Sequence, residues 1–463
     1  MKKRRDKAGG GPSGARLLVT GLLCALAAAA GLWCRATYGA QLTADEPQYL
    51  LSAISIAEDG DLDIADELAA QRWRPFHEAQ LPEQTKPLPG GRRVSPHDPL
   101  LPLLLAPAVA AGGWVGGKLA LAGVAGLLGA ATLWVAVRRF GVSAGVASLV
   151  VVIFGASMPL AAYGHQVYPE LVAALVVVAG AGALTGSLSR GGIWLLGSGI
   201  VALPWLAVKY VPVAGTLAAI GLVRLWRRGD RAGAVGFTAG LAAAGLVFLG
   251  LHQAIYGGWT PYAAGDHFVT GELGVVGFHP NYLGRGQRLI GLLVGRKFGI
   301  AAWQPAWLFA IPAVAALLRA RPTGWPVIVA PVAAGWLNAT FVALTAQGFW
   351  VPGRQIVVIL GLVVIAVAWW VDRVRTSRLF TAVGLVGIVS YGWLVIETST
   401  GRLTLIVDFW RTANPLYQAW KWALPDYVAE NTWTWPLHWA WVVVVVGLFA
   451  LGRRSRRVGF RSE

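Results

Sequence analysis

Long apolar runs, separated by short basic or Gly/Pro-rich gaps, make up most of this chain. A helix needs roughly 20 apolar residues to cross the hydrocarbon core of a bilayer, and the runs are close to that length. The sequence therefore predicts an all-α polytopic membrane protein with about 12 (11–13) transmembrane helices. The predicted spans are residues 16–36, 115–137, 144–163, 171–188, 193–209, 211–225, 233–255, 299–318, 325–344, 355–371, 379–396 and 437–451.

The basic residues fall in the gaps between these runs. They cluster at residues 1–7, 138–139, 190, 224–231, 319–321, 373–378 and 453–461. Cytoplasmic loops carry such an excess of Lys and Arg, so we expect a multi-pass protein with both termini in the cytoplasm. The Ala-, Gly-, Val- and Arg-rich usage is consistent with a high-GC bacterium, and the expected location is a bacterial plasma membrane. The apolar, Pro-rich segment 99–111 is expected to lie along or dip into the outer leaflet.

The first apolar run follows the basic stretch MKKRR and allows two interpretations. One is a signal peptide with a small-residue cleavage site in ATYGA (36–40). The other is an uncleaved first helix. The run is longer than the apolar core of an ordinary signal peptide, which favours the uncleaved helix.

The composition agrees with a membrane location. Of the 463 residues, 56% are hydrophobic and 13% are charged, and the mean hydropathy is +0.58. The net charge of +17 follows from the cytoplasmic clusters. No basic stretch is interleaved with aromatic residues as base stacking requires, so we exclude nucleic acid as a partner. The sequence also contains no Walker loop, Rossmann fingerprint or serine nucleophile elbow.

Most of the remaining polar chemistry falls in segments expected outside the membrane, within a single transmembrane domain of residues 1–463. These are a first loop with juxtamembrane helices (38–114), a second loop (256–298), a Trp/Arg-rich loop (398–435) and the short turns 164–170 and 347–354. Residues 38–98 hold 11 of the 22 acidic residues. Solvation accounts for much of this acidity. The stretch EDGDLDIADE (58–67) also suits an oxygen cage for calcium, although its spacing is not that of an EF-hand.

The acidic pair Asp45-Glu46, in TADEPQYL (43–50), lies a few residues from the end of the first apolar run. Thr43 or Asp45 followed by Pro47 fits the start of a helix, with a capping side chain and Pro in the first turn. A carboxylate near low dielectric has a raised pKa unless it is paired, which suits a general base. The two interpretations are compatible.

Basic residues expected on the outer side are rarer than those inside. Snorkelling to lipid headgroups explains many of them. Lys209 is harder to explain in this way because it interrupts an apolar stretch, where a charge is expensive and usually functional. Converging cations near an acidic pair are what a lipid phosphate requires. The outward set comprises Lys86, Arg92, Arg93, Lys209, Arg285, Arg288, Arg296, Lys297 and Arg354.

The order of a basic N-terminus, one helix and then TADEPQYL at the start of a long outer loop resembles that of the GT-C membrane glycosyltransferases. The similarity is to the branch of protein O-mannosyltransferases and lipid A aminoarabinose transferases (glycosyltransferase family 39). SPHDPLLPLLLAP (95–107) and VRRFG (137–141) resemble the family's proline-rich segment and the end of its next helix. The resemblance extends to about residue 371, through HQVYPELVAALVV (165–177), LPWLAVKY (203–210), YGGWTPY (256–262), GRKFGIAAWQPAWLFAIP (295–312) and WVPGR (350–354).

The resemblance implies a GT-C-type bundle that transfers a sugar, with inversion, from a polyprenyl-phosphate donor to an extracytoplasmic acceptor. An acidic residue of the first outer loop would act as base on the acceptor hydroxyl. Asp45 is the candidate, and Glu46 is a neighbour that orients it or binds the acceptor; which of the two takes the proton is left open. The candidates for the donor phosphate are Lys86, Lys209, Arg296, Lys297 and Arg354, with Lys209 and Arg354 foremost. The candidates for sugar or acceptor contacts are Tyr49, His97, His165, Tyr168 and Glu170.

The resemblance leaves the sugar (mannose-, arabinose- or aminoarabinose-like) and the acceptor (glycan, lipid or protein) open. His97-Asp98-Pro99 stands where some relatives carry Lys-Pro-Pro or His-Pro-Pro. No metal ligand set and no obligatory cofactor are expected, and a role for a divalent metal is left open.

Two other classes of function fit parts of the sequence. A lipid or solute transporter or flippase would explain Lys209, but it predicts an inverted repeat of broken helices, and the two halves differ in loops and motifs. A non-catalytic partner in envelope assembly would use the acidic loop as a docking surface.

Overall fold

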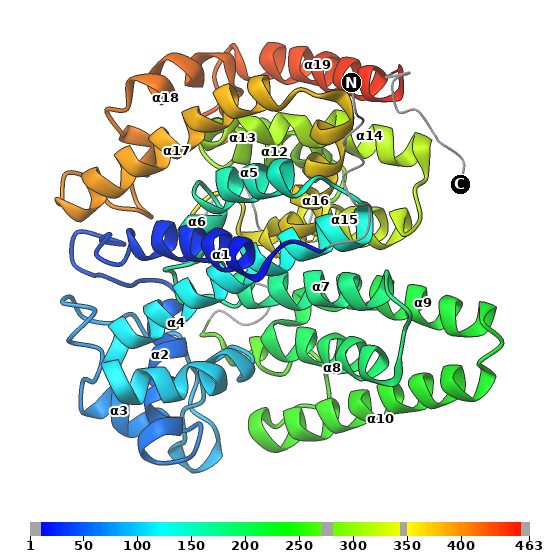
Figure 1. Cartoon of the computed structure of the whole chain (residues 1–463). Helices are drawn as coiled ribbons and strands as arrows, with labels where there is room; N and C mark the ends of the chain where they lie inside the picture. Colours follow the sequence, from blue (N-terminus) through cyan, green and yellow to red (C-terminus); the bar gives the residue numbers. More distant parts are fainter. Residues whose placement is uncertain (1–10, 270–280, 343–349, 455–463) are drawn as a thin grey trace.

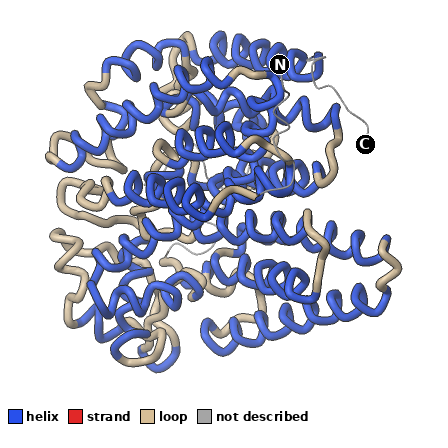
Figure 2. The backbone as a smooth tube through the Cα atoms, viewed as in Figure 1, coloured by secondary structure: helices blue, strands red, loops and turns tan. Residues whose placement is uncertain are grey.

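The computed structural model describes residues 11–269, 281–342 and 350–454. Within them the chain is built from helices, and β-pairing is confined to isolated bridges (Figure 2). The basic cluster 1–7, most of the cluster 453–461 and parts of the predicted segments 256–298 and 347–354 lie outside the described residues.

Among the described residues, six helices are long and apolar enough to cross a membrane. Four of them are α4 (Leu100–Phe140), α10 (Arg231–Tyr256), α17 (Ser377–Ser399) and α19 (Thr434–Arg454). The other two each begin with a 3-10 turn: η2 (Val208–Tyr210) leads into α9 (Val211–Arg227), and η6 (Arg354–Ile356) leads into α16 (Val357–Val374). The chain is therefore a polytopic helical membrane protein, as its sequence predicts.

Shorter apolar helices complete the bundle. They are α1 (Gly14–Ala29), α5 (Ala144–Gly155), α7 (Glu170–Leu184), α15 (Trp325–Phe341) and the pair η5 (Pro305–Phe309) and α14 (Ala310–Ala320). The remaining elements are α2 (Glu46–Glu58), α3 (Ala65–Ala69), η1 (Pro89–Gly91), α6 (Leu160–Tyr163), α8 (Arg190–Leu206), η3 (Gly265–His267), η4 (Gly284–Gln287), α12 (Arg288–Val294), α13 (Ile300–Trp303), η7 (Phe409–Arg411), α18 (Pro415–Trp420) and η8 (Lys421–Ala423).

Several boundaries differ from the predicted ones; the predicted span 299–318, for example, is divided among α13, η5 and α14. The segments 99–111 and 115–137 form one helix, α4, whose backbone leaves helical geometry at Gly112 and Gly113. The predicted span 144–163 is divided between α5 and α6, because Pro159 lacks the N–H that a continuous helix requires. The first helix ends at Ala29 rather than near residue 36. Just beyond its end, Gly31 lies so close to the His165 ring that a β-carbon would not fit.

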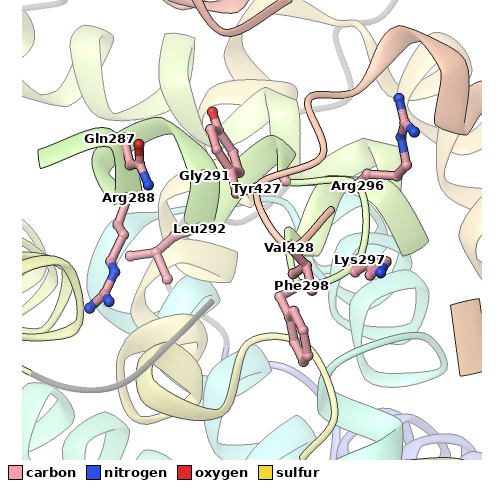
Figure 3. A pocket seen from close by; sticks show the side chains of 10 residues that line it. Gln287, Arg288, Gly291, Leu292, Arg296, Lys297, Phe298, Tyr427 and Val428 are labelled. Carbon is pink, nitrogen blue, oxygen red and sulfur yellow. The ribbon is translucent and has the colours of Figure 1, made fainter. Parts of the chain in front are cut away.

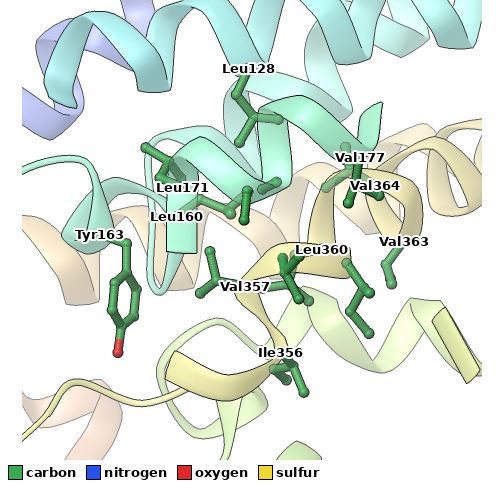
Figure 4. Packing of buried hydrophobic residues seen from close by; sticks show 14 of the residues in the cluster. Leu128, Leu160, Tyr163, Leu171, Val177, Ile356, Val357, Leu360, Val363 and Val364 are labelled. Atoms are coloured by element: carbon green, nitrogen blue, oxygen red, sulfur yellow. The ribbon is translucent and has the colours of Figure 1, made fainter. Parts of the chain in front are cut away.

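The centre of the bundle is α16, and most residues of its apolar stretch are buried. It packs against α7, α14, α5, α4 and α15, and Figure 4 shows Val357, Leu360 and Val364 of this helix among Leu128, Leu171 and Val177. Gly361 allows this approach, since a β-carbon there would collide with Val178. Small residues at helix contacts let membrane helices associate through close van der Waals packing.

The outermost helices are α10 and α19, and most of the apolar residues in each are not buried. Leu246, Val247, Val443 and Val446 are more than half exposed on them. Figure 1 shows α10 and α19 at opposite edges of the molecule. An apolar face on the outside of a bundle is what contact with lipid requires.

The Arg-rich turns meet at one end of the bundle. A β-carbon at Gly324 would touch Thr185 and Phe140, and the Ser143 hydroxyl donates to Asp372 at 2.5 Å. The Arg228 guanidinium donates to the carbonyl of Ser187 at 2.7 Å. These contacts join the turns that follow α4, α7, α9, α14 and α16, several of which lie at the right of Figure 1.

The long polar loops meet at the other end, where α2 and α3 lie (Figure 1). The Tyr38 hydroxyl donates to the Asp408 carboxylate at 2.6 Å, and Thr85 forms an isolated bridge with Phe268. The first loop therefore contacts both later loops, and α2 packs along the first part of α4.

Candidate functional site

The acidic pair lies where the first loop turns into α2. Pro47 occupies the first turn of the helix, as the sequence predicts. Asp45 has the N-cap position, but its side chain makes no capping hydrogen bond, so the prediction that it caps the helix is wrong. Ala44 adopts the left-handed conformation (φ 54°), with its carbonyl bound by the Gln84 amide at 2.9 Å. This unfavourable backbone turn directs the Asp45 side chain away from the helix end.

Asp45 forms an ion pair with Arg354, which begins η6 on the far side of the chain. The Arg354 Nη2 donates to Asp45 Oδ2 at 2.5 Å. Gly353 makes this approach possible, because it has φ 87° and its α-carbon packs against Ile300 and Pro159. The Asp45 side chain is 18% exposed, so a ligand can reach it.

Glu170, at the start of α7, extends the network. Its Oε1 accepts from Arg354 Nε at 3.1 Å and from Lys209 Nζ at 2.6 Å. Lys209 lies in η2, between α8 and α9, and its carbonyl accepts from the Asn338 amide at 3.1 Å. Four elements far apart in sequence thus bring two carboxylates and two cations into one continuous network.

Glu46 faces away from this network and is buried. Its Oε1 accepts from the backbone N–H of Val167 at 2.8 Å, and its Oε2 accepts from that of Thr43 at 3.2 Å. The second contact returns from the first turn to the residue three positions earlier, as the acidic residue of a capping box does. Glu46 therefore fastens the start of α2 to the turn between α6 and α7, and so positions Asp45.

Aromatic rings enclose the network. The Tyr49 ring stacks on His97, with 4.7 Å between centroids, and Tyr168 lies under the Arg354 guanidinium at 4.2 Å. His97 Nε2 is 3.9 Å from Asp45 Oδ1, too far for a hydrogen bond. The structure thus brings Tyr49, His97, Tyr168 and Glu170, all predicted for sugar or acceptor contacts, to Asp45.

Several buried polar atoms around Asp45 have no hydrogen-bond partner among the described residues. They are His97 Nε2, the hydroxyls of Tyr168 and Tyr210, and Glu170 Oε2. Nearly all buried polar groups in folded proteins are paired, so a group of unpaired ones needs a ligand or water to complete it. Hydroxyl and phosphate groups are the ligands that such donors and acceptors fit.

The charges of this site follow from its surroundings. Burial acts to raise the pKa of the Asp45 carboxyl, but Arg354, His97 and Lys209 outweigh it and hold that pKa below its ordinary value. Burial lowers the pKa of His97 from 6.5 to about 4, so the ring is neutral at pH 7. Burial raises the pKa of Glu46 from 4.5 to about 7, against the effects of Lys118 and the two backbone donors. Asp45 is therefore the carboxylate of the pair that is partly exposed and ionised.

Four predicted site residues lie away from Asp45's network. Lys86 donates to the carbonyl of Asp266 at 3.3 Å, and His165 is buried against Gly31. Arg296 approaches Asp426 at 3.6 Å, and Lys297 lies over the Trp410 ring at 4.6 Å. Their roles stay predictions.

Arg296 and Lys297 line a second feature, a small, partly open pocket between α12 and residues 427–428. Figure 3 shows it with Arg288, Arg296, Lys297, Phe298 and Tyr427 around its walls. Cations on an apolar pocket suit a lipid headgroup with an attached chain.

Sequence reasoning missed two buried residues that support the site. Lys118 in α4 is buried, donates to the carbonyl of Leu32 at 3.1 Å and acts electrostatically on Glu46. His252 in α10 lies 3.1 Å from Asp98, whose other oxygen accepts from Val208 N at 3.3 Å. Asp98 thereby joins the segment that carries His97 to the turn that carries Lys209. A charge inside an apolar run was the available signal for Lys118, the same one that singled out Lys209.

The comparisons with known proteins concern the fold. No protein-family model matches the chain, and no curated protein sequence matches it. A crystal structure of ArnT from Cupriavidus metallidurans bound to undecaprenyl phosphate superimposes with a TM-score of 0.52 and 16% sequence identity. The match covers 96% of this chain and 73% of ArnT. ArnT is a GT-C glycosyltransferase, so the fold of this chain is the GT-C fold that its sequence predicts.

Proposed function

We propose that this protein is a membrane glycosyltransferase that moves a sugar from a polyprenyl-phosphate donor to an extracytoplasmic acceptor, with Asp45 as the base. The observation that carries the proposal is the network Asp45–Arg354–Glu170–Lys209, with its unpaired polar surroundings. It combines a partly exposed, ionised carboxylate with two cations, and these are the groups that hydroxyl activation and a phosphate leaving group require.

Arg354 and Lys209 are the cations that we assign to the donor phosphate. Each is bound to a carboxylate in the ligand-free chain, and each has further N–H donors available for phosphate oxygens. ArnT, which shares the fold, is bound to undecaprenyl phosphate in its crystal structure. The sugar linkage of such a donor already holds the energy of transfer, so no nucleotide site is needed.

The reaction is a single displacement with inversion. The Asp45 carboxylate accepts the proton of the acceptor hydroxyl while that oxygen attacks the anomeric carbon. The bond between the anomeric carbon and the phosphate oxygen breaks, and its electron pair leaves with the polyprenyl phosphate. Arg354 and Lys209 stabilise the negative charge that develops there. The proton on Asp45 then passes to solvent or to the released phosphate.

Binding of the donor also changes the base. In the ligand-free chain Arg354 holds the pKa of Asp45 low, which makes the carboxylate a weak base. A donor phosphate competes with Asp45 for the same guanidinium and offsets its positive charge. The pKa of Asp45 then rises, so the carboxylate becomes an effective base when the donor is in place.

The site lies at the loop end of the bundle, opposite the Arg-rich turns. Under the positive-inside rule the Arg-rich end faces the cytoplasm. We therefore place the active site on the outer face of the plasma membrane, where the lipid-linked sugar and the acceptor meet. The sugar and the acceptor are the mannose-, arabinose- or aminoarabinose-like group and the glycan, lipid or protein that the family resemblance implies.

The test measures release of polyprenyl phosphate from radiolabelled polyprenyl-phosphate sugars by the purified full chain, with an envelope extract as acceptor. We expect Asp45→Asn to lower release by roughly 10³-fold or more, because it removes the base while keeping size and shape. Glu78→Gln is the matched control, since it removes an exposed carboxylate of the same loop that pairs with Arg35. Equal release by Asp45→Asn and wild type would disprove the proposal.

A further inference from the structure

A second group of carboxylates lies at the opposite end of α2 from Asp45. Asp59 follows the last residue of α2, and Asp66 and Glu67 lie in the short helix α3. One carboxylate oxygen from each of the three lies within 4.8 Å of the others. The end of α2 and the helix α3 therefore present three carboxyl groups to a common point.

Glu67 is the unusual member of this group. Asp59 and Asp66 are exposed, as surface carboxylates are, but Glu67 is only 2% exposed and its Oε2 has no hydrogen-bond partner. Within the described residues, none of the three forms an ion pair. An unpaired buried carboxylate is costly unless a positive charge neutralises it.

The other acidic side chains of residues 58–67 have hydrogen-bond or ion-pair partners nearby. The Asp63 carboxylate accepts from the backbone N–H groups of Ala65 and Arg93 at 3.1 and 2.8 Å. Asp61 accepts from the Ser55 hydroxyl at 2.9 Å. Arg72, the neighbouring cation, places both of its terminal nitrogens on Glu58, at 2.7 and 2.5 Å. The loop thus provides partners for Glu58, Asp61 and Asp63, whereas the carboxyl groups of Asp59, Asp66 and Glu67 face one another without a paired cation among the described residues.

We propose that Asp59, Asp66 and Glu67 bind a divalent cation, and that the cation is Ca²⁺. The ligands are all carboxylate oxygens, without His or Cys, which suits a hard cation rather than zinc. Ca²⁺ accepts irregular geometry and six to eight oxygens, so waters complete the three protein ligands, whereas Mg²⁺ requires a near-ideal octahedron. The carbonyl end of α2, beside Asp59, adds a partial negative charge that favours a cation.

The bound cation connects α2 to α3. Residues Leu50, Leu51 and Ala53 of α2 are fully buried, and the N-terminus of the same helix positions Asp45. A cation at the C-terminal end therefore stabilises the loop that carries the site but takes no part in sugar transfer. The inference holds or fails independently of the proposed function.

Thermal unfolding of the full chain in detergent, followed by Trp fluorescence after removal of metals with EDTA, tests the site. We expect 5 mM CaCl₂ to raise the midpoint by about 2 °C or more, since binding to the folded state alone shifts unfolding by mass action. The same concentration of MgCl₂ should give a smaller rise. Glu67→Gln and Asp59→Asn should each abolish the calcium response.

Both variants are expected to fold, so a lost calcium response would report the loss of the site and not unfolding. Glu67→Gln replaces the buried carboxyl group by an uncharged amide of the same shape, so it should unfold no earlier than the metal-free wild type while losing the response. Asp59 is exposed, so Asp59→Asn should fold normally. Glu78→Gln, an exposed acid of the same loop, should keep the full response. No rise in the wild type, or an equal rise in Glu67→Gln, would overturn the proposal.

Discussion

Arg354 donates a hydrogen bond of 2.5 Å to Asp45, joining residues that are 309 positions apart in the chain. The same guanidinium reaches Glu170 through Nε at 3.1 Å and lies over the Tyr168 ring. Arg354 is therefore the residue on which the carboxylates of the first loop and of α7 converge. Its substitution should affect both the base and the proposed phosphate site.

Arg354→Gln should lower transfer by about 10²–10³-fold, the usual effect of removing a donor that stabilises developing charge. It should also move the acid limb of the kcat/KM profile to higher pH. Burial raises the pKa of Asp45 and Arg354 is the main group that lowers it, so without Arg354 the carboxyl protonates at a higher pH. The measurement is the pH profile of polyprenyl phosphate release by both proteins.

Arg354→Lys separates charge from geometry. It keeps a cation but not the planar fork that reaches Asp45 and Glu170 at once, so we expect intermediate activity and a smaller shift of the acid limb. Arg74→Gln, in the exposed part of the first loop, should leave the profile unchanged. An Arg354→Gln profile that coincides with the wild type at its acid limb would show that Asp45 is not the titrating group.

Glu46 gives a prediction about stability rather than chemistry. Its pKa is 4.5 in the unfolded chain and is raised to about 7 by burial in the folded one. Between these values the folded state binds more protons than the unfolded state, so the free energy of unfolding falls as pH rises from about 4.5 to 7. Over this range the free energy of unfolding falls by on the order of 3 kcal/mol, and Glu46 causes no further fall above about pH 7.

Glu46→Gln should remove this dependence. The amide does not titrate, so its unfolding midpoint should change less across pH 4.5–7 than that of the wild type. At low pH the variant should be the less stable of the two, because one of the N–H groups of Thr43 and Val167 then faces an amide nitrogen. Parallel midpoints for both proteins over this pH range would contradict the assignment of Glu46 as a buried, proton-binding positioning residue.

The sequence was sufficient to predict the helical membrane fold and the two ends of the bundle. Apolar runs of membrane length and clustered Arg residues are local signals that do not depend on the partners of each helix. Asp45, Lys209 and Arg354 were found for a related reason, since a charge beside an apolar run is conspicuous. Their convergence in one network adds weight to these predicted roles.

Other features depend on contacts between distant segments and have no local signal. The N-cap hypothesis for Asp45 was wrong because Arg354 provides a stronger partner and Ala44 turns the backbone. Glu46 gains its position from Val167, and Asp98 from His252 in α10. The break between α5 and α6 follows from one proline, but its location relative to the site depends on the packing of Gly353 against Pro159.

The partly exposed Lys209 pairs with the buried Glu170, and a double-mutant cycle should show their coupling. Lys209→Met leaves Glu170, which is fully buried, with Arg354 as its remaining cation. We expect this substitution to lower the free energy of unfolding by about 2 kcal/mol, the usual value of a hydrogen bond to a charged group, because Arg354 still compensates the Glu170 charge. Lys209→Met/Glu170→Gln should recover part of that loss.

Activity should not recover in the double variant, because Lys209 is assigned to the donor phosphate. The measurements are chemical denaturation of each member of the cycle and polyprenyl phosphate release at saturating and limiting donor. Additive losses of stability would mean that the contact of 2.6 Å between Lys209 and Glu170 makes no energetic contribution. Full activity of Lys209→Met would remove Lys209 from the phosphate site.

Gly353 should be as sensitive as the charged residues it positions. At φ 87° an L-residue is strained, and an added β-carbon would lie 3.0 Å from both Ile300 and Pro159. Gly353→Ala should therefore lower the free energy of unfolding by about 2 kcal/mol or more and displace Arg354 from Asp45, with a corresponding loss of transfer.

Gly257→Ala is a matched control, because Gly257 has φ 76° but no atom within 4 Å of the added β-carbon. It reports the backbone strain alone, so it should cost about 1 kcal/mol and leave transfer intact. Equal effects of the two substitutions on transfer would show that the close packing beneath Gly353 does not position Arg354.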